Sequence, residues 1–352
     1  MRPLTYQRAS DARDAISATA SGATPAGAAE TEPPTMAPVQ FIAGGTNILD
    51  FMKLSCWQAD GLVDINGLDG DLAVINAQPD GLHIGALVRM SDAADHPVVR
   101  REFPVLAEAL LLGASNQIRN MASFGGNVLQ RTRCHYFRDV SYEACNKRSP
   151  GSGCAALAGN NRVHAVLGVT EQCISTYPGD LAQALVALDT QVHISGVDSD
   201  QTIALEDLHL DAHSPERETV LVPGDLITGF FVPAGPHTRR SAYVKVRDRQ
   251  SYEFGLATAA VALHLDSDNR VLDVRIGLGG VAYRPWRARD AERWLTGRFL
   301  DDSTAEETGR IAFQDAVTHG QNDYKPALGA RTVARALQQA AGTHDASEET
   351  DR

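Results

Sequence analysis

Long apolar runs and paired-cysteine motifs are missing from this sequence of 352 residues. No stretch of eighteen apolar residues occurs, so the sequence predicts no membrane insertion. Residues 1–20 lack a charged segment followed by an apolar one, and we therefore expect no signal peptide on this chain. The sequence also has no GxGxxG fingerprint, Walker loop or CxxC pair, so a Rossmann domain, a P-loop and a zinc ribbon are not supported. The histidines, with His135 and His164 among them, are expected to act beside ligands or at the surface and not as ligands.

Positive charge is also in short supply, because 32 Lys and Arg face 44 Asp and Glu, for a net charge of -12. A protein of this charge is a poor partner for nucleic acid or an anionic membrane. The length predicts two or three domains, each large enough to bury its own core.

Cysteine is scarce, but its distribution is informative. Of five cysteines, four fall within forty residues, at Cys134, Cys145, Cys154 and Cys173. Four thiolates can complete a tetrahedral zinc site or bind the corners of an iron–sulfur cluster. Disulfides are typical of smaller secreted chains, and buried thiols that serve only packing would be scattered. The spacing therefore favours a metal centre over disulfides or structural thiols without naming the metal, and Cys56 is expected to be a buried or idle thiol.

The residues around these cysteines also fit a metal centre. Glycines beside Cys154 let the backbone fold closely around a bulky group. Lys147, Arg148, Arg131 and Arg133 supply positive charge, which is expected to lower the pKa of the thiols and offset the charge of a cluster.

Hydrophobic periodicity and turn residues predict an alternation of short strands and helices. The predicted strands are at residues 1–7, 39–43, 62–65, 82–84, 174–177, 192–194, 201–205, 226–232, 241–247, 255–265 and 271–282. The predicted helices are at residues 10–20, 104–113, 180–188, 288–295, 305–317 and 331–341.

Two glycine turns stand out among the loops. Gly44-Gly45-Thr46-Asn47 directly follows an apolar strand, and consecutive glycines expose backbone N–H groups that can hold a pyrophosphate. The segment 123–127 repeats the glycine–glycine–polar theme about eighty residues later. Two such turns could hold opposite sides of one dinucleotide, although a plain glycine hairpin or loop is the alternative for either of them.

At these motifs the sequence resembles a known family. Segments 41–49 (FIAGGTNIL), 123–127 (SFGGN) and 244–247 (VKVR) resemble the FAD-binding medium subunit of the xanthine oxidase family, the molybdenum hydroxylases. The resemblance extends over about residues 1–340. It implies an α+β protein with a FAD-binding fold of the PCMH (vanillyl-alcohol-oxidase-like) type in two α/β subdomains. A C-terminal α+β domain follows, with an antiparallel sheet and helices as in carbon monoxide dehydrogenase flavoproteins.

The resemblance also implies a domain plan. The expected units are a FAD-binding domain at 1–215 with subdomains of about 1–66 and 67–215, an insertion at 129–173, a C-terminal domain at 220–342 and a disordered tail at 343–352. The polar, proline-containing segment 211–218 agrees with a boundary there.

The insertion narrows the resemblance to one branch of the family. Segments 129–134 (LQRTRC), 145–148 (CNKR), 150–157 (PGSGCAAL) and 164–166 (HAV) resemble the flavin subunit of three-subunit bacterial aldehyde oxidoreductases of periplasmic type. In those subunits the insertion implies a 4Fe–4S cluster, which would be ligated here by Cys134, Cys145, Cys154 and Cys173. With this resemblance 4Fe–4S is favoured over zinc. The flavin subunit of hydroxybenzoyl-CoA reductase also carries a cluster-bearing insertion but is less similar locally.

The resemblance implies FAD contacts at fifteen positions. The first turn would bind the diphosphate, the second would hold its other side and the ribityl region, and later residues would contact the adenosine or flavin ends. The implied FAD contacts in the two turns are Phe41, Ile42, Ala43, Gly44, Gly45, Thr46, Asn47, Ile48, Leu49, Ser123, Gly126 and Asn127. Asp180 would bind the adenosine end (its alternative is a helix N-cap), Ile227 would be an apolar contact, and Lys245 would lie near the isoalloxazine.

The function implied is electron transfer, with no catalytic residue of substrate oxidation on this chain. A large partner subunit would carry the molybdenum cofactor, and a small one would carry 2Fe–2S clusters, in a heterotrimer or a dimer of heterotrimers. Electrons would pass to FAD here and then to an external acceptor. The complex would be periplasmic by co-export with a signal-bearing partner, or cytoplasmic. The alternatives are a stand-alone FAD oxidase, a flavin subunit like that of hydroxybenzoyl-CoA reductase, and a zinc-stapled interaction protein.

Overall fold

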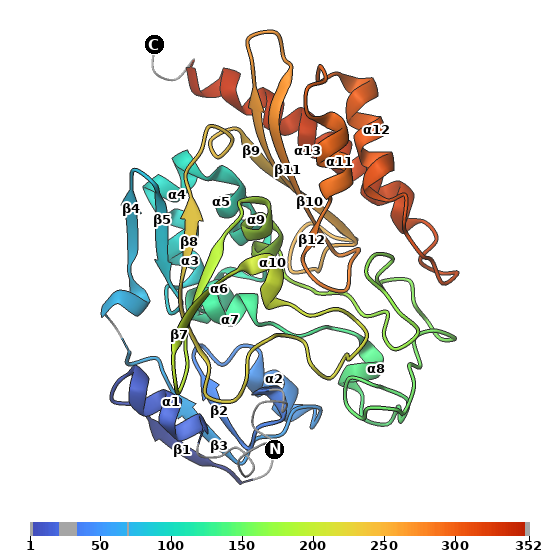
Figure 1. The fold of residues 1–352 in the computed structure, drawn as a ribbon. Helices are drawn as coiled ribbons and strands as arrows, with labels where there is room; N and C mark the ends of the chain where they lie inside the picture. The colour runs from blue at the N-terminus through green and yellow to red at the C-terminus, as the bar shows by residue number, and fades with distance from the viewer. Residues whose placement is uncertain (1–2, 21–33, 69, 349–352) are drawn as a thin grey trace.

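The computed structural model describes residues 3–20, 34–68 and 70–348. They form three sheets, with the N-terminal one at the bottom of Figure 1, the second above it and the C-terminal one at the upper right. No helix in the described part of the chain is both long and apolar enough to cross a membrane.

The first sheet is parallel and has three strands in the order β1-β3-β2. Its strands are β1 (Thr5–Arg8), β2 (Val39–Ile42) and β3 (Gly61–Asp64), with helices α1 (Ala12–Ala20) and α2 (Ile48–Lys53). Val63 of the central strand is fully buried against Ala15 and Ile16 of α1, so one apolar face of this helix covers the sheet. Residues 1 and 2 of the first predicted strand lie outside the described residues.

The second sheet is antiparallel and has five strands in the order β4-β5-β8-β6-β7. Its strands are β4 (Ile75–Gln78), β5 (Gly81–Gly85), β6 (Gln191–Ser195), β7 (Asp200–Ala204) and β8 (Leu226–Pro233). Its helices are α3 (Met90–Asp95), α4 (Pro97–Glu102), α5 (Pro104–Leu112), α6 (Asn116–Met121), α7 (Phe124–Val128), α9 (Leu181–Ala187) and α10 (Leu205–Leu208). In sequence, strand β8 comes after the domain boundary that was predicted at 215–220. In the structure it nevertheless pairs with β5 and β6 in the middle of this sheet.

The third sheet is antiparallel, in the order β12-β11-β10-β9. Its elements are β9 (Ser241–Val246), β10 (Ala257–Leu265), β11 (Val271–Gly279), β12 (Trp286–Arg287), α11 (Arg289–Leu295), α12 (Asp302–Ala312) and α13 (Lys325–Glu348). The predicted tail begins at residue 343, but α13 continues to Glu348, so residues 343–348 are helical. Residues 349–352 of that tail lie outside the described part.

Strand β10 is buried on both faces, which explains its nearly continuous apolar sequence ATAAVALHL. Ala260 and Ala262 belong to the core shared with α5 and α9, whereas Val261 and Leu263 belong to the core shared with α13. Alternate side chains of β10 therefore face different helix layers, so the sheet joins the two halves of the chain.

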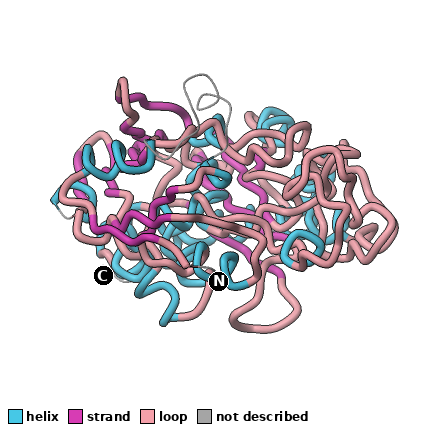
Figure 2. The backbone as a smooth tube through the Cα atoms, turned by 90° about the horizontal axis from the view of Figure 1, so that it is seen from below, coloured by secondary structure: helices cyan, strands magenta, loops and turns pink. Residues whose placement is uncertain are grey.

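The insertion at 129–173 contains little regular structure (Figure 2, right). It holds the short helix α8 (His135–Arg138) and an isolated antiparallel bridge between Cys145 and Cys154. The predicted strand at 174–177 is wrong, because this segment makes only single backbone bonds, such as Tyr177 N–H to the Ala282 carbonyl at 3.1 Å, and no continuous ladder.

Candidate functional site

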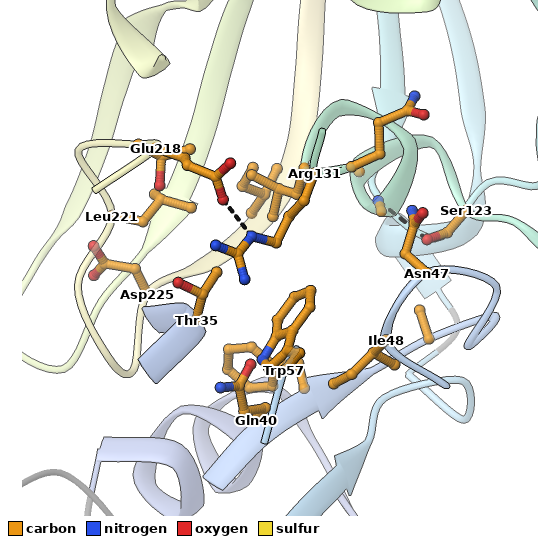
Figure 3. A pocket seen from close by; sticks show the side chains of 18 of the residues that line it. Thr35, Gln40, Asn47, Ile48, Trp57, Ser123, Arg131, Glu218, Leu221 and Asp225 are labelled. Atoms are coloured by element: carbon orange, nitrogen blue, oxygen red, sulfur yellow. Dashed lines mark hydrogen bonds and ion pairs between the residues drawn. The ribbon is translucent and has the colours of Figure 1, made fainter. Parts of the chain in front are cut away.

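A cavity lies between the first sheet, the second sheet with its helices, and the start of the insertion. Its walls come from strand β2 with the turn after it, from residues 122–132, and from residues 209–227. In Figure 3, Arg131 projects into the cavity between Glu218 and the ring of Trp57. Such a concave site with a mainly apolar lining and a few converging polar groups is typical of a cofactor site.

The first glycine turn connects β2 to α2 and packs tightly on its neighbour. A Cβ on Gly44 would lie 1.9 Å from the Met121 carbonyl oxygen, so only glycine allows this approach. Gly45 has a φ of +72°, a left-handed conformation that glycine adopts without strain. Asn47 is held from outside the turn, because Arg133 donates to its Oδ1 at 2.6 Å.

The second glycine turn is the first turn of helix α7. Ser123 is its N-cap, and its Oγ accepts a hydrogen bond from the Gly126 N–H at 3.2 Å. Since Gly44 touches Met121, the two glycine turns lie next to each other and line the same cavity.

The predicted FAD residues divide into two groups. Ten of them line this cavity: Phe41, Ala43, Gly44, Gly45, Thr46, Asn47, Ile48, Ser123, Gly126 and Ile227. Five do not line it: Ile42, Leu49, Asn127, Asp180 and Lys245.

Asp180 and Lys245 instead contact each other, with Lys245 Nζ 2.7 Å from Asp180 Oδ2. The Tyr243 hydroxyl also donates to Asp180 at 2.8 Å. Burial raises the pKa of this carboxyl, and the nearby Lys245 only partly opposes the effect. Asp180 stands at the N-cap position of α9, as its alternative interpretation had it, but its side chain makes no capping hydrogen bond there. Because they touch, the pair can serve one end of an extended dinucleotide and not both ends.

Three charged side chains that were not predicted as FAD contacts also line the cavity: the buried Arg131 and Lys147 and the partly buried Glu218. Glu218 is paired with Arg131 and, at 2.8 Å, with Lys147 Nζ. Burial opposes ionisation of Glu218, but the two cations outweigh it and lower the pKa of the carboxyl. Glu218 stands in the polar segment 211–218, and nothing local in the sequence distinguishes it from a surface residue.

The four clustered cysteines line one small second cavity, together with Lys147 and Ser175. All five cysteines of the chain are free thiols, so the disulfide alternative is wrong. The long-range contacts of the insertion therefore bring together four side chains that are separated by up to forty residues in sequence.

The expected lowering of a thiol pKa by a nearby cation is seen at Cys173. Burial raises the pKa of Cys134 to about 12. The hydrogen bond between Cys154 and Cys173 raises the pKa of Cys154, and it lowers that of Cys173 to about 6 with help from Lys147. The expectation fails at Cys134 because burial dominates, and at Cys154 because its hydrogen bond to Cys173 stabilises the protonated thiol.

The chemistry of these four thiols fits a thiolate-ligated cluster, but the cavity is closed. Its volume is about 20 Å³, which is room for one water molecule. A cluster would require the side chains to move apart. Within residues 3–20, 34–68 and 70–348, no group of three or more His, Cys, Asp or Glu side chains is already spaced to hold a metal ion.

Two further residues that the sequence singled out, His164 and Cys56, lie outside the lining of this second cavity. His164 is buried, and its Nε2 lies 3.2 Å from Cys134 Sγ, beside a ligand candidate as expected. Cys56 is half-buried in an apolar cluster with Phe51 and Phe137, and it does not line the cavity.

Comparison with known families identifies the chain. The family described as "FAD binding domain in molybdopterin dehydrogenase" matches residues 3–235, and "CO dehydrogenase flavoprotein C-terminal domain" matches residues 241–340. The chain therefore belongs to the FAD-binding medium subunits of the molybdenum hydroxylase family. The predicted family and the predicted fold class are both confirmed.

Among individual relatives, the aldehyde oxidoreductase FAD-binding subunit PaoB of Escherichia coli (strain K12) is 45% identical, over 86% of this chain and 91% of that protein. The carbon monoxide dehydrogenase medium chain of Afipia carboxidovorans is 25% identical, over 85% of this chain and 88% of that one. Both names describe subunits of oxidoreductases.

A solved structure shares the fold. Carbon monoxide dehydrogenase from Hydrogenophaga pseudoflava superposes with a TM-score of 0.73 at 22% identity, over 97% of this chain and 98% of that chain.

Proposed function

We propose that this chain is the FAD- and 4Fe–4S-containing electron-transfer subunit of a molybdenum-dependent aldehyde oxidoreductase. The observation that carries the proposal is the pair of neighbouring cavities, one lined by two glycine turns and one by four thiols, with Lys147 and Ser175 lining both. The 45% identity to an aldehyde oxidoreductase subunit supports an aldehyde as the substrate class of the complex.

In this proposal the first cavity binds FAD. The backbone N–H groups of Gly44 and Gly45 and the Ser123–Gly126 turn hold the diphosphate, and Ile227 is an apolar contact. The Asp180–Lys245 pair lies outside the lining and binds at most one end of the dinucleotide. Bound FAD supplies the ability to exchange electrons singly or in pairs.

The second cavity binds the cluster through Cys134, Cys145, Cys154 and Cys173. The donor set supports this, because four thiolates are the usual ligands of a 4Fe–4S cluster. The loops that carry the cysteines have little regular structure, so ligation can separate the thiols without breaking a sheet.

The chain accepts electrons from a small 2Fe–2S subunit and passes them to an external acceptor. A large subunit with the molybdenum cofactor converts the aldehyde to the acid. The assembly is a heterotrimer or a dimer of heterotrimers, either in the periplasm through co-export with a signal-bearing partner or in the cytoplasm.

The test uses the assembled complex under anaerobic conditions. Addition of an aldehyde is expected to bleach the flavin absorption, whereas the chain alone is expected to stay oxidised because it has no site for substrate. Turnover of a small donor by the chain alone would contradict the proposal and favour a stand-alone oxidase.

A cysteine variant tests the cluster in the same experiment. We expect the cluster to order the insertion, because metal ligation supplies folding free energy. Cys154→Ser should therefore lower the yield of complex more than the rate of flavin reduction, while Cys56→Ser, outside the cavity, should behave like wild type. Normal assembly of Cys154→Ser with slow flavin reduction would place the cluster on the electron path instead.

A further inference from the structure

Lys147 occupies a singular position between the two cavities. Its side chain is 3% exposed and lines both of them. Its Nζ lies 2.8 Å from Glu218 Oε1, 2.9 Å from the Tyr283 hydroxyl and 3.0 Å from the Pro215 carbonyl oxygen. Three acceptors therefore fix the ammonium within the wall.

Apart from the four thiols, the charged side chains of this wall do not cancel. Lys147 and Arg131 are both buried and share a single carboxylate, Glu218. The other contacts of Arg131 are with the rings of Trp57 and Phe137, at 5.1 and 4.7 Å from the ring centroids, and these carry no net charge. One positive charge is left over in a buried place, which is costly unless an anion lies nearby.

The remaining cations of the insertion line neither cavity: Arg133, Arg138, Arg148 and Arg162. Arg133 and Arg138 share Asp50, both at 2.7 Å. Arg162 pairs with Asp248 at the surface, 47% exposed. Among the described residues, Lys147 is thus the only cation that lines both cavities, where anionic groups would bind.

We propose that Lys147 is a positioning residue that couples the two cofactor sites electrostatically, by favouring the reduced form of both the cluster and the flavin. This inference rests on the proposed function. Each one-electron reduction adds one negative charge, and a fixed cation nearby stabilises the product more than the reactant. The same ammonium therefore raises both reduction potentials.

Opposite changes in charge should produce opposite shifts. Lys147→Met removes the surplus positive charge and is expected to lower the midpoint potentials of both the cluster and the flavin. Lys147→Arg should keep both potentials near the wild-type values. Glu218→Gln preserves the shape of the side chain but enlarges the surplus, and should raise both potentials. Arg162→Met removes a surface cation of the insertion and should change neither.

The measurement is an anaerobic redox titration of the full complex, followed by visible absorption for the flavin and by EPR for the cluster. If Lys147 had only a structural role, the midpoint potentials of Lys147→Met and Glu218→Gln would not shift in opposite directions. Unchanged potentials in both variants, or a shift at only one cofactor, would overturn the inference.

Two controls keep the test decisive. If Lys147→Met fails to assemble, Glu218→Gln alone decides, since a rise at both cofactors supports the inference and no rise overturns it. Iron and FAD analysis of the wild type distinguishes a failure of the proposed function from a failure of the coupling by Lys147. Wild type without iron would defeat the proposed function, whereas wild type with both cofactors and unmoved variants would defeat only the coupling.

Discussion

Two buried lysines in this chain have contrasting surroundings. Lys147 is paired with the carboxylate of Glu218. Lys325 is fully buried and donates to two carbonyl oxygens, those of Val163 at 2.9 Å and Gly280 at 2.5 Å. Among the described residues, Lys325 has no carboxylate in contact with its ammonium group. Burial therefore lowers the pKa of Lys325 to about 7.

This lowered pKa predicts that the free energy of unfolding depends on pH. Between pH 7 and about 10.5 the unfolded chain binds a proton at Lys325 that the folded chain lacks, so this residue makes stability rise with pH in that window. The free energy of unfolding of wild type minus that of Lys325→Met should be flat below pH 7 and then rise by up to about 1.4 kcal/mol per pH unit. Denaturant unfolding at pH 6, 7, 8 and 9 measures it, and a difference independent of pH would show that Lys325 keeps an ordinary pKa.

Some residue contacts could be predicted from the sequence and others could not. The grouped cysteines point to a shared site because local clustering of a scarce residue is visible along the chain. The contact of Asp180 with Lys245 is not visible, since 65 residues separate them and Lys245 lies on β9, the neighbour of the strand β10 on which α9 packs. The same holds for Glu218 and Arg131, which are 87 residues apart.

At the scale of the element, the first glycine turn depends on its contact with the segment before α7. In Gly44→Ala the new methyl group would meet the Met121 carbonyl oxygen at 1.9 Å, and backbone cannot yield as a side chain can. We expect a loss of about 1–3 kcal/mol in stability and at least about a tenfold weaker binding of FAD. Fluorescence titration of the apoprotein with FAD measures the affinity.

A nearby glycine supplies the matched control. A Cβ on Gly67 would meet only Arg8 Cδ, at 3.9 Å, so Gly67→Ala should bind FAD like wild type. Equal FAD affinity in both variants would mean that the close approach at Gly44 does not shape the site.

The elements that were predicted best have apolar patterns matching their burial. Strand β10 and helix α9 are buried on all sides, and their apolar runs are plain in the sequence. The segment at 174–177 has a strand-like pattern too, but its backbone partners are isolated residues, Ala165 in the insertion and Ala282 in the connection between β11 and β12. An apolar pattern reports burial, and it cannot report whether a ladder partner is present.

At the scale of the whole molecule, the insertion connects parts that are distant in the chain. Arg133 reaches Asn47 beside the first sheet, Lys147 reaches Glu218, and Lys325 of α13 reaches back to Val163. The resemblance to a family could predict that an insertion is present and where it starts. Its contacts could not be predicted, because they depend on loop conformations that no periodicity encodes.

The central claim, that one chain holds both FAD and a 4Fe–4S cluster, is tested most directly by its cofactor content. Iron, acid-labile sulfide, zinc and FAD should be measured on the full-length chain in its complex, purified without oxygen. We expect about four iron atoms, about four sulfides and one FAD per chain, with an EPR signal on reduction. One zinc per chain without iron, or a colourless chain without flavin, would contradict it.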